Sequence, residues 1–199
     1  MTFNPPRSEF SARLVSRNGL EAAGFREWVF HPAMLFGALQ TWWGGGADRD
    51  WPHEGLDICC YRDARDHIHR LDGSFRVPAM YEGEVTAIRD DFLGESIFVR
   101  HSARDGDGRL LHTVYGHTAP DGDVGVGAAL REGEVFATIA EPSLKSGAPP
   151  HLHLTVAWVS PSDSHGALDW STMSDARRVV LVDPLRVASF PHVVFPHVP

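Results

Sequence analysis

The chain has 199 residues, of which 43% are hydrophobic and 22% are charged, and its formal net charge is −8. These values are typical of one globular domain and exclude a disordered or collagen-like chain. The acidic balance argues against a nucleic-acid-binding protein whose affinity comes from neutralised phosphates. The sequence has no run of 18 apolar residues, so it predicts no transmembrane helix. The 12 histidines are the unusual feature of the composition.

The first part of the chain, residues 1–46, is predicted to be an extension that packs on a core domain. Within it we expect a helix over residues 8–17, with Ser8 as its cap and an Asn-Gly pair as its stop. Glycines 44–46 then interrupt the chain. The N-terminus lacks the basic start and apolar run of a signal peptide. We therefore expect either a cytoplasmic protein or one whose leader for the periplasm, cell envelope or exterior has been removed.

Residues 47–199 are predicted to form a mainly β domain. Short runs of apolar alternation are separated by glycine-containing turns about every ten residues, which is typical of antiparallel sheets. A turn over residues 105–108 predicts a β-hairpin. We expect an antiparallel β sandwich or partly open barrel, with a short helical insertion over residues 170–178. The expected strands are residues 96–101, 110–117, 134–140, 151–159 and 179–182, and residues 77–88 show apolar alternation around Gly83.

A histidine and an aspartate stand four residues apart at His53 and Asp57. The two side chains can meet at one point if the chain turns at Gly55 and then enters a strand. An imidazole nitrogen and a carboxylate oxygen are ligands of the kind that zinc takes. Alone this spacing is weak evidence, because a surface histidine and aspartate are often bystanders. The neighbouring Glu54 is expected to face solvent.

A second candidate is the H-x-H pair of His151 and His153 on an expected strand. The two-residue period of a strand places both imidazoles on one face and the intervening leucines on the other. The pair can share a metal, or one histidine can bind it while the other faces a substrate. An exposed polar strand face is the plainer interpretation. His67 and His69 have the same spacing, but they follow a charged tract that lacks a strand's apolar face, and we predict that both are solvated.

The third candidate is Tyr115-Gly116-His117, at the end of the expected strand 110–117. A histidine at the end of a strand lies at the mouth of a β core, where a site can form. A histidine whose hydrogen bonds are satisfied within a loop is the alternative interpretation.

In this order, H-x-x-x-D, Y-x-H and H-x-H resemble the motifs of the M23 metallopeptidases, the LytM/lysostaphin type of zinc endopeptidase. The segments between them resemble the family as well, over about residues 51–187, down to a closing Asp-Pro-Leu at residues 183–185. The chain departs from the family in two places. Pro149 stands where the family usually has a glycine before H-x-H, and Leu154 and Thr155 follow the motif in place of an aromatic residue.

The resemblance implies a LytM-like peptidase fold, a zinc ion held by His53, Asp57 and His153, and catalysis by His117 and His151. Three protein ligands leave a fourth zinc position for water, which is the arrangement of catalytic zinc sites. The implied activity is that of a zinc endopeptidase that cleaves peptidoglycan, in a stem peptide or a cross-bridge. A metal-activated water would attack, assisted by the two histidines.

Two further expectations concern the surroundings of this site. Arg49 and Tyr115 are expected to line the substrate groove. Cys59 and Cys60 are adjacent, and neighbours in a strand point to opposite faces, so we expect free, buried thiols that neither form a disulfide nor bind the metal.

Two other classes of function remain open. A non-catalytic relative would use the groove as a cell-wall or partner-binding module, although its usual mark, a lost ligand, is absent. A cupin-type metal oxidoreductase needs an early H-x-H followed by a carboxylate, for which His67 and His69 have only Asp72 or Glu82 in poor context. Bound zinc would support the peptidase, and iron the oxidoreductase. The sequence does not predict the oligomeric state.

Overall fold

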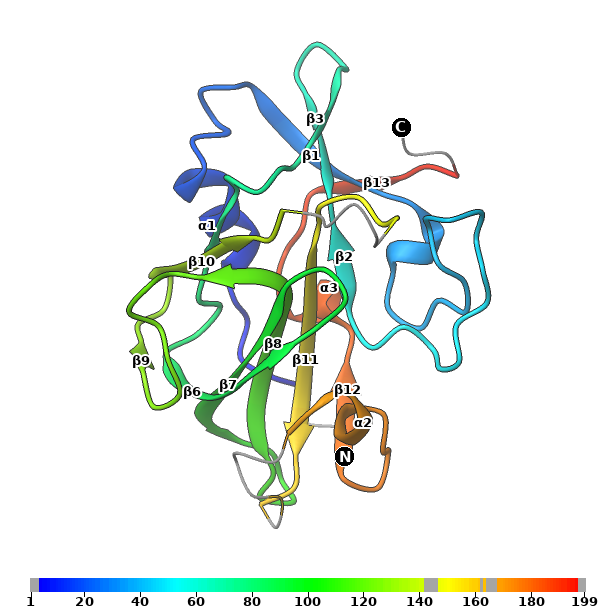
Figure 1. Ribbon diagram of the computed structural model, residues 1–199. Coiled ribbons are helices and arrows are strands. Elements are labelled where there is room, and N and C mark those ends of the chain that lie inside the picture. The colour runs from blue at the N-terminus through cyan, green and yellow to red at the C-terminus, as the bar shows by residue number, and fades with distance from the viewer. Residues whose placement is uncertain (1–3, 142–146, 162, 164–167, 197–199) are drawn as a thin grey trace.

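The computed structural model describes residues 4–141, 147–161, 163 and 168–196. The fold is mainly β with two sheets, which confirms the predicted fold class (Figure 1). The described part contains no helix that is long and apolar enough to cross a membrane. The helices are short: α1 is Phe10–Arg17, the 3-10 helix η1 is Pro32–Met34, α2 is Trp170–Met173 and α3 is Pro184–Val187.

A nine-stranded sheet forms the centre of the molecule. Its strands are β2 Leu56–Ile58, β5 Arg76–Pro78, β6 Gly83–Asp90, β7 Glu95–Arg104, β8 Leu110–Pro120, β9 Ala129–Leu130, β10 Val135–Ile139, β11 Leu152–Val159 and β12 Val179–Val182. The main path runs β12-β11-β8-β7-β6-β9, while β2 pairs with β11, and β10 pairs with β8 and β5. Figure 1 shows β8 and β11 side by side through the middle of the molecule. Every residue of β11 is buried, so polar side chains on this strand lie inside the protein.

The expected elements agree with this sheet in most places. The predicted hairpin is confirmed: the Asp105 N–H donates to the Arg109 carbonyl at 3.0 Å, and Gly108 adopts a φ of +80° that favours glycine. The alternating segment of residues 77–88 belongs to two strands, because the chain leaves β5 at Pro78 and enters β6 at Gly83. The helical insertion exists, but it is the single turn α2.

A second, four-stranded sheet contains β1 Phe25–Phe30, β3 Cys60–Asp63, β4 Ile68–Arg70 and β13 His192–Val194, in the order β13-β1-β3-β4. The prediction that the tract around His67 and His69 lacks a strand is wrong. Antiparallel pairing with β3 places His69 opposite Tyr61, and the two rings stack with their centroids 4.8 Å apart. A pattern of charges along one strand carries no information about the partner strand that supplies the apolar contact.

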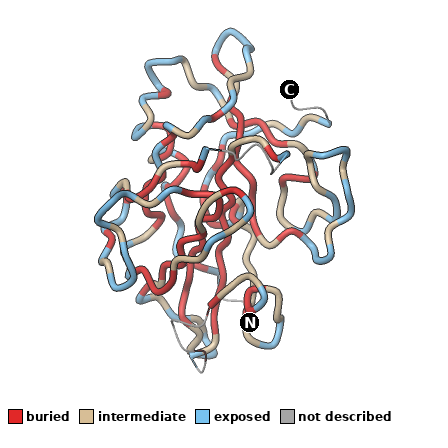
Figure 2. The backbone as a smooth tube through the Cα atoms, in the orientation of Figure 1, coloured by how far each residue is buried: buried red, intermediate tan, exposed pale blue. Residues whose placement is uncertain are grey.

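The N-terminal helix α1 packs its apolar residues into the main core. Phe10 and Leu14 of α1 and Trp28 of β1 belong to the same buried cluster as the strands of the large sheet. Figure 2 shows the buried residues concentrated in the central strands and the exposed ones in the peripheral loops. The predicted cap is wrong by one residue: Glu9 is the N-cap, although the Ser8 hydroxyl accepts from the Phe10 N–H at 3.2 Å and donates to the Met80 carbonyl. The division of the chain at residue 46 stays a prediction.

A long connection, residues 31–55, joins β1 to β2 and lies beside β2 (Figure 1). Its regular parts are η1 and one isolated bridge between Gln40 and Asp48. Although much of this connection is exposed, three of its side chains, Trp42, Arg49 and His53, contact Asp57 on β2. The connection therefore positions part of the candidate site.

Candidate metal centre and active site

His53, Asp57 and His153 meet at one buried point. His153 Nδ1 lies 2.9 Å from Asp57 Oδ1, and His53 Nε2 lies 3.1 Å from both of these atoms. The pairing of β2 with β11 explains the meeting, because Asp57 and His153 are direct register partners. Within the part of the chain that the structure describes, these residues form the one group of three histidine, cysteine or acidic side chains placed to hold a metal ion.

The hydrogen bonds around the three residues orient them toward that point. His53 Nδ1–H donates to the Leu35 carbonyl at 3.0 Å, so the neutral ring presents the lone pair of Nε2 to Asp57. His153 Nε2 lies 2.9 Å from the Thr155 hydroxyl, and when Nε2–H donates there, Nδ1 also presents a lone pair. Two nitrogen lone pairs and a carboxylate then face one another, an arrangement that a cation stabilises.

The second oxygen of Asp57 is held separately from the first. Trp42 Nε1–H donates to Asp57 Oδ2 at 2.8 Å, and an Arg49 guanidinium nitrogen lies 3.5 Å from the same oxygen. This leaves Oδ1 directed at the two histidines. Burial raises the pKa of the Asp57 carboxyl, but the positive charge that the neighbouring imidazoles of His53 and His151 carry when protonated outweighs burial and holds the pKa well below its usual range. The carboxylate is therefore ionised.

The turn between His53 and Asp57 requires a glycine. A Cβ atom at Gly55 would lie 2.3 Å from the Leu154 carbonyl oxygen and 2.9 Å from His153 Nε2. The backbone of this turn therefore lies directly against β11, which brings the first histidine to the ligand group.

The donor set fits a zinc ion. Two imidazole nitrogens and one carboxylate oxygen are typical zinc ligands, and ligand atoms about 2.0–2.2 Å from a tetrahedral zinc lie about 3.3–3.6 Å apart. The observed separations of 2.9–3.1 Å are slightly smaller, so a small outward movement accommodates the ion. Burial lowers the pKa of His153, which favours the neutral ring that a metal requires.

His151 and His117 lie next to this group. Their ring centroids are 4.6 Å apart, and His151 Nε2 lies 3.7 Å from Asp57 Oδ1. His151 Nδ1–H donates to the Pro149 carbonyl at 2.8 Å, which leaves Nε2 aimed into the site, buried and without a hydrogen-bond partner among the described residues. Burial lowers the pKa of His151 to about 4, so its ring is neutral at neutral pH.

A cleft of about 320 Å³ opens onto the site. Aromatic rings form much of its wall: Trp43 stacks on Phe92 with centroids 6.0 Å apart, and Phe92 contacts the His117 ring edge to face. Trp170 of α2 closes another side against His153, at a centroid distance of 5.0 Å. The lining residues are Trp43, Arg49, Glu54, Asp57, Asp91, Phe92, His117, His153 and Trp170.

The sequence expectations about this region have mixed outcomes. Arg49 lines the cleft, as predicted. The prediction for Tyr115 is wrong, because its side chain is buried in the core and its hydroxyl accepts from the Met80 N–H at 2.7 Å. Cys59 and Cys60 are free and buried, as predicted.

Trp42, Asp91 and Trp170 were not predicted to belong to the site. Asp91 accepts from His117, and no motif marks it, because it lies 26 residues before that histidine in a different hairpin. An indole or a carboxylate far along the chain gives no sequence signal of such a contact.

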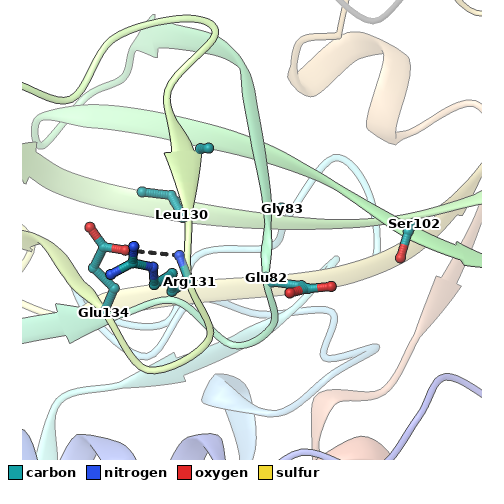
Figure 3. A pocket seen from close by; sticks show the side chains of 7 residues that line it. Glu82, Gly83, Ser102, Leu130, Arg131 and Glu134 are labelled. Atoms are coloured by element: carbon teal, nitrogen blue, oxygen red, sulfur yellow. Dashed lines mark hydrogen bonds between the residues drawn. The ribbon is translucent and has the colours of Figure 1, made fainter.

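A second hollow of about 530 Å³ lies away from the histidines, between β6, β7 and the turn after β9 (Figure 3). Glu82, Arg131 and Glu134 line it, and all three are exposed. In this turn the Arg131 backbone N–H donates to the Glu134 carboxylate at 2.8 Å. Although this hollow is the larger of the two, the charged residues that line it are exposed surface side chains, and the buried histidines lie at the other cleft.

No protein-family model and no curated protein match the chain. Solved M23 peptidases do. The catalytic domain of a mutant of the prophage-encoded M23 protein EnpA from Enterococcus faecalis is 18% identical over 60% of this chain and 77% of that chain, with a TM-score of 0.40. The catalytic domain of the antimicrobial peptidase lysostaphin from Staphylococcus simulans is 16% identical over 82% of this chain and 92% of that chain, with a TM-score of 0.40.

A chain of the SpoIIQ–SpoIIIAH pore-forming complex is similar as well, at 19% identity over 86% of this chain and 89% of that chain, with a TM-score of 0.44. The structure is thus similar to those of M23 peptidases and of a pore-complex protein, and it contains the buried His–Asp–His group that the motifs predict.

Proposed function

We propose that this chain is an M23-type zinc endopeptidase that hydrolyses peptide bonds in peptidoglycan, in stem peptides or cross-bridges. The observation that carries the proposal is the convergence of His53, Asp57 and His153 beside His151, which is buried, and His117, which lines the adjoining cleft. His53 Nε2, Asp57 Oδ1 and His153 Nδ1 would hold the zinc. When bound, zinc lowers the pKa of a coordinated water from about 15.7 to about 7 and polarises a carbonyl group.

His117 and His151 would carry out the proton transfers of the reaction. Hydrolysis adds water across the C–N bond: the oxygen joins the carbonyl carbon, one proton leaves the water and the departing amine gains one. Both rings have Nδ1 occupied, by Asp91 for His117 and by Pro149 for His151, which leaves Nε2 free on each. His117 lines the cleft, and the buried Nε2 of His151 lies 3.7 Å from Asp57 Oδ1. One Nε2 accepts the proton of the attacking water, and a protonated Nε2 donates to the amine or stabilises the oxyanion.

The lining of the cleft supports a peptide as substrate. Trp43, Phe92 and Trp170 supply aromatic surface beside the histidines in a cleft of about 320 Å³. Arg49, whose guanidinium lies 5.5 Å from the centre of the Trp43 ring, and Glu54 add one charge of each sign. A cleft lined by aromatic rings and by charges of both signs is suited to a peptide, which offers both apolar and polar groups.

Digestion of purified peptidoglycan with the zinc-loaded chain, followed by mass analysis of the released peptides, tests this function. We expect new peptide termini that disappear in His117→Ala and in the presence of a zinc chelator. Binding to the wall without release of peptides, from every wall type tried, would contradict the enzyme and favour the binding module.

A further inference from the structure

Asp91 contacts the site from a part of the chain that the motifs do not mark. It lies in the turn between β6 and β7, and its side chain is 4% exposed. Asp91 Oδ1 accepts from His117 Nδ1–H at 3.0 Å, and Asp91 Oδ2 accepts from the His117 backbone N–H at 2.9 Å. One carboxylate therefore binds both the ring and the backbone of a single histidine.

The backbone of His117 has an unusual conformation at this contact. In the pairing of β7 with β8, Glu95 is opposite Thr118 and Ile97 is opposite Tyr115, so Gly116 and His117 together face the single residue Ser96. This is a β-bulge, a feature that redirects side chains near active sites. His117 adopts a φ of +63°, which non-glycine residues rarely take, and the surrounding contacts must hold it there.

The bulge changes where the His117 side chain points. Tyr115, two residues earlier, packs against Phe10 and Phe136 in the core. Regular alternation would direct His117 to the same side, yet its ring lies against His151 and Phe92 in the cleft. The bulge removes the His117 backbone N–H from the hydrogen bonds between the two strands, and this N–H donates to Asp91 Oδ2 instead.

The Asp91 carboxylate also accepts hydrogen bonds from its own turn and from the start of β7. Oδ1 accepts from the Leu93 and Gly94 N–H groups at 2.8 and 2.9 Å, and Oδ2 accepts from the Ser96 hydroxyl at 2.6 Å. Burial raises the pKa of Asp91, but the hydrogen bond and charge of His117 outweigh it and hold the pKa well below its usual range. A carboxylate surrounded by donors can only accept, so the proton of the neutral His117 ring must be on Nδ1.

We propose that Asp91 is a positioning residue for His117, which fixes the Nδ1–H tautomer and the bulge so that the lone pair of Nε2 faces the cleft. For its catalytic consequence this inference rests on the proposed function. The wrong tautomer would present a hydrogen in place of the lone pair, and His117 could then no longer accept a proton from water.

The competing explanation is that Asp91 only stabilises its turn. The chain offers a matched control in Asp105, in the turn at the other end of β7. Asp105 Oδ1 accepts from the Asp107 and Arg109 N–H groups at 3.0 and 2.8 Å, the same type of turn contact as in Asp91, but without a histidine. Its side chain is 7% exposed, close to the value for Asp91.

The test compares Asp91→Asn with Asp105→Asn in the zinc-loaded chain. Nitrogen-15 NMR of the histidine rings reports the tautomer of His117, and kinetics on a released peptidoglycan peptide separate kcat from KM. In Asp91→Asn we expect a changed His117 tautomer population and a kcat lower by about 10²–10⁴-fold, with KM within about threefold of the parent. Asp105→Asn should leave the His117 spectrum and kcat unchanged.

Equal losses of kcat in the two variants, or an unaltered His117 spectrum in Asp91→Asn, would overturn the inference. The parent chain alone provides a further measurement that needs no folded variant: its His117 must carry the proton on Nδ1, and a proton on Nε2 would overturn the inference as well. If the parent cleaves no peptidoglycan, the proposed function fails, while the tautomer measurement still decides the role of Asp91.

Discussion

The chain contains two H-x-H pairs, each at the start of a strand, and each pair shares one aspartate. His69 Nε2 lies 2.9 Å and His67 Nδ1 3.5 Å from Asp63 Oδ2. The corresponding distances from His153 and His151 to Asp57 Oδ1 are 2.9 and 3.7 Å. By spacing and by carboxylate distance the two clusters are nearly the same.

The two clusters differ in burial and in whether a third histidine lies beside the aspartate. The His67 and His69 side chains are 69% and 41% exposed, whereas those of His151 and His153 are 0% and 8% exposed. Asp63 Oδ1, the oxygen that does not contact the two imidazoles, accepts from two backbone N–H groups of the turn. Among the described residues no third histidine is placed to complete a metal-binding group with Asp63. At Asp57 the third histidine is His53, supplied by a separate segment. An H-x-H pair with an acid is therefore not enough: the candidate metal group is distinguished from a surface ion pair by burial and by a further histidine from a separate segment.

The largest expected effect follows removal of a ligand. His53→Ala and His153→Ala each leave two donors, so we expect stoichiometric zinc and peptidase activity to be lost together. Elemental analysis of the purified variants and their cleavage rates measure this. His69→Ala is the control from the other cluster. A His53→Ala variant that retained one zinc per chain would show that the ligand assignment is wrong.

Removal of a histidine that carries a proton should separate binding from turnover. In His117→Ala and His151→Ala the three ligands remain, so zinc should stay bound while kcat falls by about 10²–10⁴-fold. The same two measurements apply to each variant. The division of roles would be contradicted by loss of zinc from His117→Ala as complete as that from His53→Ala.

A buried histidine with no acid beside it isolates the effect of burial. His101 donates from Nδ1 to the Glu82 carbonyl, Nε2 accepts from the Thr113 hydroxyl, and burial lowers its pKa from 6.5 to about 4. The unfolded chain therefore takes up this proton first, and stability is lost as the pH falls from about 6.5 toward 4. The loss amounts to at most about 3 kcal/mol.

Urea unfolding at pH 7 and pH 4.5 checks this expectation in the parent and in His101→Gln, which can keep both hydrogen bonds without titrating. We expect the parent to lose about 2–3 kcal/mol more than the variant between the two pH values. Equal losses in both proteins would exclude His101 as the cause.

A smaller effect is expected from the indole that holds Asp57. Trp42→Phe removes the hydrogen bond to Oδ2 but keeps a ring against His151, and we expect zinc affinity to fall by about 10–100-fold, as for other groups that orient metal ligands. Competition with a zinc chelator measures the affinity. Trp43→Phe, beside it, should bind zinc like the parent, and an equal loss in both variants would contradict a specific role for the Trp42 hydrogen bond.

No effect on zinc content or cleavage rate is expected from His67→Ala or His69→Ala. These side chains are partly exposed and share an aspartate that is already bound by turn N–H groups. Cleavage assays and metal analysis on both variants provide the check. A loss of zinc in either would remove the distinction between the two clusters.

The sequence predicted the ligand group and its neighbours because each short motif lies on one strand or turn, where spacing determines direction. His53 and Asp57 meet through a turn at Gly55, and His151 and His153, just before and within the strand β11, both lie beside Asp57 Oδ1. Asp91 could not be predicted in this way, since its contact with His117 depends on a bulge in β8 that breaks the two-residue period. The same bulge explains why Tyr115 is buried although the alternation grouped it with His117.

Trp42 and the strand of His69 could not be predicted for a related reason. Each depends on a partner that is brought alongside by the fold, Asp57 for Trp42 and β3 for the strand β4. Sequence periodicity describes one element, whereas these contacts join two.

Anomalous diffraction at the zinc edge from crystals of the zinc-loaded chain tests the central claim most directly. We predict one peak, about 2.0–2.2 Å from His53 Nε2, Asp57 Oδ1 and His153 Nδ1. A peak at Asp63, His67 and His69 with none at Asp57, or the absence of any zinc peak in fully loaded crystals, would contradict it.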